Sequence, residues 1–100
     1  ISLSGSFTVE GFLSGYYDDL CYYNNPAHYI QNMTDPFYLD RYNNSIELTL
    51  VTSDWDVCRD RNEYFHHLLS EKQIRHNYYF WEGHVNHDWP TWQKMIGHYI

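Results

Sequence analysis

The sequence predicts an α/β fold in which parallel strands are joined by crossover helices. Residues 46–52 and 77–81 are short runs rich in β-branched and aromatic side chains, which is typical of strands. Between them, apolar residues recur at helical spacing over about 59–72, and a second helical pattern covers about 90–99. Because strands separated by a helix are usually parallel, this order of elements predicts a parallel sheet.

The composition is that of a folded domain with an acidic surface. Of the 100 residues, 43% are hydrophobic and 20% are aromatic, which excludes a disordered chain. The formal net charge of −7, with only six Lys and Arg residues, excludes non-specific nucleic-acid binding. Apolar stretches are too short for a transmembrane helix or a signal peptide, so we expect no membrane partner. We expect a cytoplasmic protein, with a signal peptide on upstream sequence left open; the oligomeric state cannot be read from the sequence.

The two cysteines do not form a recognisable motif. Cys21 and Cys58 lie far apart and lack the Cys-x-x-Cys spacing of redox and zinc sites. We therefore expect two free, buried thiols, although the sequence leaves a disulfide between them open.

The first residues predict the end of a buried strand. The chain opens with an apolar run over 1–7 and has neither an initiator Met nor a polar arm. We therefore expect residues 1–100 to be the C-terminal part of one larger domain. In this expectation 1–7 is a strand end, 8–45 is a helical, cap-like excursion, and 46–100 is a β-α-β-α unit.

The excursion is rich in tyrosine and predicts short helices. Apolar side chains at helical spacing start near Val9, but Gly11 and Gly15 keep any helix there short. Asn25-Pro26 and Asp35-Pro36 each predict an N-cap followed by the first helical residue, with helices to about residues 30 and 42. Its tyrosines either pack with their hydroxyls in water or line a cap over a pocket.

The second half predicts two strands, each followed by a helix. The strand at 46–52 is followed by an exit loop at 53–56 and a helix at 59–72, with Asp60 and Glu63 resembling a capping box. The predicted buried stripe of that helix consists of Tyr64, Phe65, Leu68 and Leu69. After the strand at 77–81, Asp88 is a suitable N-cap for the last helix. The predicted core side of the last helix consists of Trp92, Met95, Ile96 and Tyr99.

Acidic and imidazole side chains follow the two strands. Loops at the carboxyl ends of parallel strands share one edge of the sheet, so Asp54 or Asp56 can approach His84 or His87. A carboxylate that accepts from one imidazole nitrogen leaves the other nitrogen free to act as a general base. The order acid and then histidine is that of the α/β-hydrolases, but their Gly-x-Ser-x-Gly elbow is absent. Ser4 lacks both flanking glycines and is a poor substitute for the nucleophile.

Several stretches resemble esterases of the esterase D type, and together they span nearly the whole chain. They include residues 3–7, 12–19, 23–26, 55–58 and 61–62, and the most specific are Tyr-Asn-Asn-Pro at 23–26 and His-Asp-Trp-Pro-Thr-Trp at 87–92. The resemblance implies an α/β-hydrolase whose nucleophile segment precedes Ile1. It also implies a small-molecule ester substrate, no cofactor, His87 as the general base and Asp56 as the acid that orients it.

Two departures from that family leave competitors for these roles. Ser53 stands where the family usually has glycine, and His84-Val85-Asn86 replaces a glycine-bearing loop. Asp54 therefore competes with Asp56 for the acid role, and His84 competes with His87 for the base role.

Other interpretations of the same residues are less specific. Asp88 predicts a helix cap, Trp89 and Trp92 predict packing anchors, and His66, His67 and His76 predict exposed positions. A metal site could use three side chains of the 84–88 loop together with Asp56, but Pro90 and the lack of paired cysteines disfavour it, and we expect no metal. The alternative function is a non-catalytic module that binds a glycan or protein through its tyrosine-rich face.

Overall fold

The computed structural model describes all residues 1–100 and confirms the α/β class. The strands are β1 (Ser2–Leu3), β2 (Thr49–Trp55) and β3 (Asn77–Asn86). A 3-10 helix, η1 (Glu10–Phe12), precedes five α-helices: α1 (Asp19–Tyr23), α2 (Pro26–Gln31), α3 (Pro36–Ser45), α4 (Arg59–Glu71) and α5 (Trp89–Tyr99). None of these helices is long and apolar enough to cross a membrane.

The three strands form one parallel sheet in the order β1-β2-β3, as predicted. Leu3 pairs with Val51 at one side of β2, and residues 49–53 of β2 pair with 77–81 of β3 at the other. Both crossovers are long enough for parallel pairing, because the excursion precedes β2 and α4 precedes β3. The carboxyl ends of all three strands therefore meet at one edge of the sheet.

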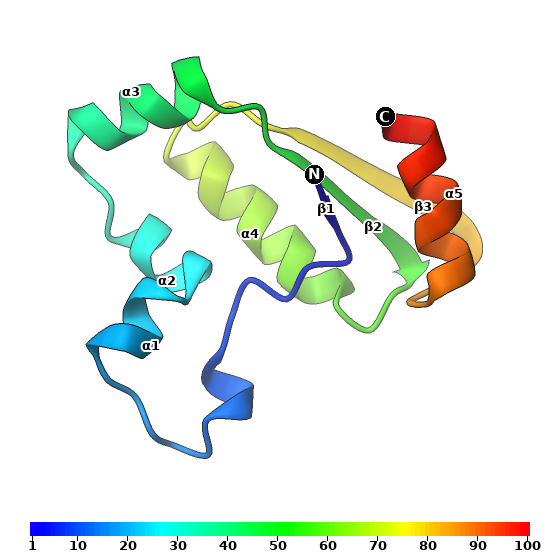
Figure 1. The fold of residues 1–100 in the computed structure, drawn as a ribbon, viewed down its shortest axis with the longest axis horizontal. Coiled ribbons are helices and arrows are strands. Elements are labelled where there is room, and N and C mark those ends of the chain that lie inside the picture. The colour runs from blue at the N-terminus through cyan, green and yellow to red at the C-terminus, as the bar shows by residue number, and fades with distance from the viewer.

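Helices α4 and α5 lie on either side of the sheet (Figure 1). Side chains alternate along β3, so neighbouring tyrosines face opposite helices. Tyr78 stacks on His66 of α4 at 4.2 Å between ring centroids, and Tyr79 stacks on Tyr99 of α5 at 4.7 Å. The sheet is thus covered by one helix on each face.

The main core lies between α4, β2 and α2. Leu50 of β2, Ala27 and Ile30 of α2, and Phe65, Leu68 and Leu69 of α4 are buried in one cluster with Ile74. The excursion helices extend from the side of α4 away from the strands, as Figure 1 shows. The excursion is mainly helical, as predicted, and Asn25 and Asp35 occupy the predicted N-cap positions of α2 and α3. Helix α1 was not predicted; Asp18 caps it by accepting from the Cys21 N–H.

Both predicted strands are shifted or too short. β2 starts at Thr49, three residues later than predicted, and it continues through the predicted exit loop to Trp55; Ile46, before it, is 42% exposed. β3 likewise continues to Asn86. Residues of the two predicted loops thus pair with each other: Trp55 pairs with Asn86, beyond a register shift between Ser53 and Trp55. This pairing lengthens the sheet at its carboxyl edge.

The predicted start and buried stripe of α4 are partly wrong. Its N-cap is Cys58, and no side chain forms a capping bond there, so Asp60 and Glu63 are not a capping box. Tyr64 is 48% exposed, and Asn62 takes its place in the buried stripe. The Asn62 amide donates to Gly5 O at 2.8 Å and to Cys58 O at 2.9 Å, which explains a polar residue on this face.

Three other predictions also need correction. His66 and His76 are half-buried and joined by a 2.7 Å hydrogen bond, so only His67 of the three histidines is exposed. Burial lowers the pKa of His66, and the neighbouring histidines lower it further. Both cysteines are free, but only Cys58 is buried, since Cys21 is half-exposed. In α5, Met95 is fully buried whereas Ile96 is 43% exposed.

Truncating one buried and one exposed side chain of α4 tests which face of this helix packs in the core. Leu69 is fully buried, so Leu69→Ala should lower the free energy of unfolding by about 2–5 kcal/mol through the cavity that it leaves. Tyr64→Ala, on the same helix, should cost less than about 1 kcal/mol because that ring is exposed. Urea denaturation of both variants measures the difference, and equal losses would contradict the observed face of α4.

Candidate active site

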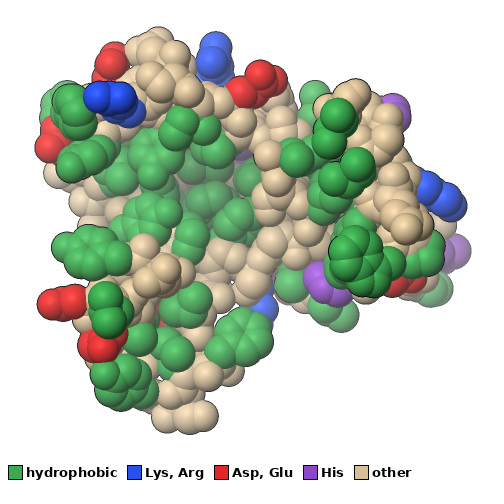
Figure 2. Space-filling view, viewed as in Figure 1, with side chains coloured by type: hydrophobic (Ala, Val, Ile, Leu, Met, Phe, Trp, Pro, Cys, Tyr) green, Lys and Arg blue, Asp and Glu red, His purple; other side chains and the backbone are tan.

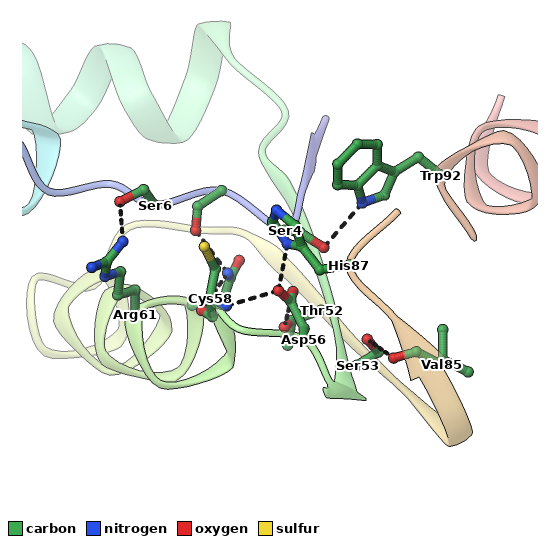
Figure 3. Close-up of polar contacts among 12 residues, drawn as sticks. Ser4, Ser6, Thr52, Ser53, Asp56, Cys58, Arg61, Val85, His87 and Trp92 are labelled. Atoms are coloured by element: carbon green, nitrogen blue, oxygen red, sulfur yellow. Dashed lines mark hydrogen bonds and ion pairs between the residues drawn. The ribbon is translucent and has the colours of Figure 1, made fainter. Parts of the chain in front are cut away.

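The sheet places three polar side chains at its carboxyl edge. Ser4 follows β1, Asp56 follows β2 and His87 follows β3. The parallel order brings these positions together although up to 83 residues separate them, from residue 4 to residue 87. Figure 3 shows the three side chains converging above the end of β2.

His87 and Asp56 form a direct pair. His87 Nδ1 lies 2.7 Å from Asp56 Oδ1, which fits an N–H donated by the imidazole to the carboxylate. The Asp56 side chain is completely buried, whereas that of His87 remains 30% exposed. The carboxylate thus fixes the ring, and Nε2 has no hydrogen-bond partner within the protein.

Further donors hold the Asp56 carboxylate in place. Thr52 Oγ1 donates to Oδ2 at 2.7 Å, and the Cys58 backbone N–H donates to Oδ1 at 2.8 Å. A buried carboxylate is costly unless it is hydrogen-bonded, and these donors come from both sides of the turn that carries it. The turn itself is closed by the Asp56 N–H, which donates to Ser53 O at 3.3 Å.

The same environment keeps Asp56 ionised. Burial alone raises its pKa, but hydrogen bonds to the carboxylate outweigh burial and hold the pKa below its usual value. The groups that lower it are Ser4, the Cys58 N–H, Thr52 and His87. An ionised acid beside an imidazole stabilises the imidazolium that forms when the ring accepts a proton.

Ser4 is part of this support rather than a free hydroxyl. It is 5% exposed, and its backbone has a φ of 56°, in the left-handed region. Its Oγ accepts from Trp92 Nε1 at 3.2 Å, and its hydroxyl contributes to the lowered pKa of Asp56. The sequence indicates only that Ser4 is a poor nucleophile and gives no sign of this contact, because Trp92 lies 88 residues further along the chain.

Trp92 also packs against the imidazole. Its ring meets that of His87 edge to face at 4.9 Å between centroids and 85° between planes. Asp88 caps α5 by accepting from the Thr91 N–H at 3.1 Å, as predicted, so the helix that carries Trp92 starts directly after His87. The position of the imidazole is therefore set by Asp56 on one side and by α5 on the other.

Asp54 has a different environment from Asp56. Its carboxylate accepts the backbone N–H groups of Gly83, His84 and Val85 at 2.9–3.0 Å. These bonds, led by that from His84, lower the pKa of Asp54 to about 2. Asp54 thus holds the turn in β3 and has no hydrogen bond to His87.

His84 is likewise separate from the Asp56 pair. Its backbone has a φ of 64°, and its exposed ring packs against Trp55 at 4.2 Å between centroids. It makes no side-chain hydrogen bond to either aspartate. Among the two aspartates and two histidines that the sequence offers for an acid–histidine pair, only the side chains of Asp56 and His87 hydrogen-bond to each other.

The potential metal ligands differ from those of the sequence pattern. Asp88 is occupied as a helix cap, and His84 packs on Trp55. Ligand atoms of Asp56, Cys58 and His87 instead lie within 4.8 Å of one another. Cys58 joins this cluster because it lies two residues after Asp56, at the N-cap of α4, a proximity that is already visible in the sequence.

His87 opens onto a cavity of about 550 Å³. The lining is mostly apolar and comes from β1, the segment after β3 and α5: Leu3, Ser4, His87, Trp89, Trp92, Gln93 and Ile96. A cavity of this size accommodates a small organic group next to the imidazole. Trp89, predicted as a packing anchor, is 72% exposed at its rim.

The comparisons with known proteins concern the fold. No profile of a known family matches the sequence, and no curated protein matches it. Among solved structures, the chain is similar to a ferulic acid esterase, with a TM-score of 0.72 and 17% sequence identity. The match covers 96% of this chain but 38% of that one, so this chain spans well under half the length of the esterase. At this identity, the similarity shows a shared fold.

Removing the Asp54 carboxylate should loosen the turn in β3. Asp54→Ala leaves three backbone N–H groups without their acceptor, so amide hydrogen exchange at Gly83, His84 and Val85 should accelerate about tenfold or more. Asp40→Ala, which removes an exposed acceptor on α3, is the control and should leave these three amides unchanged. Unchanged exchange in Asp54→Ala would contradict this role.

The hydrogen bonds that Asp54 accepts predict that the stability of the turn in β3 depends on pH. The folded-state pKa of Asp54, about 2, lies below the ordinary value of about 4, so its stabilisation of the turn is complete above about pH 4. It is lost as the pH falls toward 2, because the protonated carboxyl accepts these bonds poorly. Exchange at Gly83–Val85, corrected for intrinsic rates, should therefore accelerate over that pH range in the wild type and not in Asp54→Ala.

Proposed function

We propose that this chain carries the acid and base of a serine-dependent carboxylic ester hydrolase of the α/β-hydrolase fold. The observation that supports it most is the 2.7 Å pair between buried Asp56 and half-exposed His87, with the imidazole facing a cavity. The structural similarity to a ferulic acid esterase agrees with this class of reaction.

In the proposed reaction, His87 moves protons and Asp56 orients it. Because Nδ1–H is committed to Asp56, Nε2 accepts the proton of a serine hydroxyl as that oxygen attacks the ester carbonyl. The resulting imidazolium, stabilised by Asp56, gives the proton to the departing alcohol. Water then attacks the acyl-serine by the same route, with His87 again as the base.

The serine is proposed to lie outside residues 1–100, in the remaining N-terminal part of the same domain. β1 is an edge strand with one neighbour, so its outer backbone groups are free to pair with a further strand that leads to a nucleophile elbow. Ser4 is buried, and its Oγ already accepts from Trp92 Nε1. Hydrophobic side chains also gather in the hollow between the excursion helices and the sheet, as Figure 2 shows, and would be covered by such a segment.

An apolar or aromatic ester is the proposed substrate class. The cavity at His87 is lined by Leu3, Ile96 and two tryptophans, which favour an apolar acyl or alcohol group. The other side chains of the lining are those of Ser4, His87 and Gln93, which are polar.

The alternative is a non-catalytic binding module that uses the tyrosine-rich excursion. A cavity of about 590 Å³ lies among α1, α2 and α3 and is lined by Tyr22, Tyr23, Tyr29, Tyr38 and Tyr42 together with four other residues. Aromatic faces with neighbouring amide and carboxylate groups are suited to a sugar ring. Binding of oligosaccharides without ester hydrolysis by the intact protein would favour this alternative.

Substitution of the base tests the ester hydrolase. In the intact protein, His87→Ala should lower kcat for a p-nitrophenyl ester by roughly 10³-fold or more, because no other group can accept the serine proton. Asp56→Asn should lower kcat by roughly 10⁴-fold, since an amide cannot stabilise the imidazolium or hold the required tautomer.

His84→Ala is the matched control in the same segment. It removes an exposed imidazole that makes no contact with Asp56, so kcat should remain within about threefold of wild type. Normal turnover in His87→Ala together with loss in His84→Ala would overturn the assignment of the base.

A serine-directed probe locates the nucleophile. A fluorophosphonate should label the intact protein at one serine upstream of residue 1, and His87→Ala should label far more slowly. Labelling at Ser4, abolished in Ser4→Ala, would contradict the proposed location.

A further inference from the structure

The candidate active site contains a thiol that the proposed reaction does not use. Cys58 is free and 9% exposed, and its Sγ lies within 4.8 Å of ligand atoms of both Asp56 and His87. Its backbone N–H supports Asp56, but its side chain makes no hydrogen bond. Figure 3 shows the sulfur close to the Asp56 carboxylate.

Together, these three side chains form a mixed ligand set. A carboxylate oxygen, a thiolate sulfur and an imidazole nitrogen are ligands that Zn²⁺ accepts at about 2.0–2.3 Å. Asp56 and Cys58 are almost fully buried, whereas His87 lines the 550 Å³ cavity. Cys58 is also the N-cap of the 13-residue helix α4, which fixes its backbone next to the turn that carries Asp56.

We propose that Asp56, Cys58 and His87 bind a thiophilic divalent cation of the Zn²⁺ type, and that the bound ion prevents His87 from acting as a base. The proposed inhibition rests on the proposed ester hydrolase, whereas the proposed binding site does not.

Binding at this position changes the tautomer of His87. Nδ1 now carries the proton that faces Asp56, so coordination of Nδ1 requires that proton to leave and the ring to be protonated at Nε2 instead. The Cys58 thiol loses its proton to solvent, and one proton is released overall. An imidazole protonated at Nε2 cannot accept a proton from serine, so the bound ion blocks the reaction.

The geometry requires only local movement. Tetrahedral Zn–N and Zn–O bonds of about 2.0–2.2 Å place the two ligand atoms roughly 3.3–3.6 Å apart, so Nδ1 and Oδ1, now 2.7 Å apart, must separate by somewhat less than about 1 Å. The sulfur must move toward the pair from within 4.8 Å, which a change of the Cys58 side-chain rotamer can supply. Thr52 can continue to donate to the other oxygen of Asp56.

Metal titration of the intact protein tests the site without relying on activity. Co²⁺ should bind and give a thiolate-to-metal charge-transfer band in the near ultraviolet, and Zn²⁺ should displace it. Cys58→Ser should abolish the band and weaken Zn²⁺ binding, measured by calorimetry, about tenfold or more. Cys21→Ser, which changes the distant thiol on α1, should retain the band and the wild-type affinity.

The folding of each variant is checked by circular dichroism, and Cys58→Ala serves as a second variant. A missing charge-transfer band in wild type, or Zn²⁺ binding that neither Cys58 variant weakens, would overturn the site.

Activity provides the second measurement. Zn²⁺ should inhibit ester hydrolysis by the wild type, and a chelator should restore the activity. With each rate expressed relative to that protein's own metal-free rate, Cys58→Ser should need about tenfold more Zn²⁺ than the wild type for the same fractional inhibition. Active enzyme that Zn²⁺ does not inhibit would contradict the switch while the ester hydrolase stands. Metal binding with the thiolate band in a protein without esterase activity would support the site and reject the proposed function.

Discussion

The buried carboxylate of Asp56 is the constraint on which the site depends. Taking an ionised acid out of water costs several kcal/mol unless each oxygen finds donors, and here the donors come from different parts of the chain. Thr52 belongs to β2, the Cys58 N–H to the start of α4, and His87 to the segment after β3. Satisfying one carboxylate therefore fixes the end of the sheet, the start of a helix and the imidazole relative to one another.

The two neighbouring aspartates illustrate how backbone geometry separates roles. In a regular strand, Asp54 and Asp56 would face the same side, because side chains alternate with a period of two. The turn closed by the Asp56 N–H and Ser53 O, together with the irregularity at the end of β2, separates them. Asp54 then binds backbone amides of β3, and Asp56 binds the imidazole.

The last helix contributes to the site through one side chain. Trp92 lies edge to face against His87 and donates to Ser4, so α5 is linked both to this imidazole and to the end of β1. Ser4 also lowers the pKa of Asp56, so side chains from the carboxyl ends of all three strands meet around this carboxylate. Such a network holds the imidazole in one position, as the proposed proton transfer requires, and it also gathers the ligand atoms of the proposed cation site.

The sequence by itself determined the features that depend on nearby residues. Period and composition identified the crossover helix and parallel strands, and Asp35 and Asp88 were recognised as caps because a cap acts within three residues. The strand ends, which of Asp54 and Asp56 contacts His87, and the contacts of Ser4 were decided by the tertiary structure. Their partners lie about 30 to 88 residues away, and only the packed sheet determines which of several plausible side chains meet.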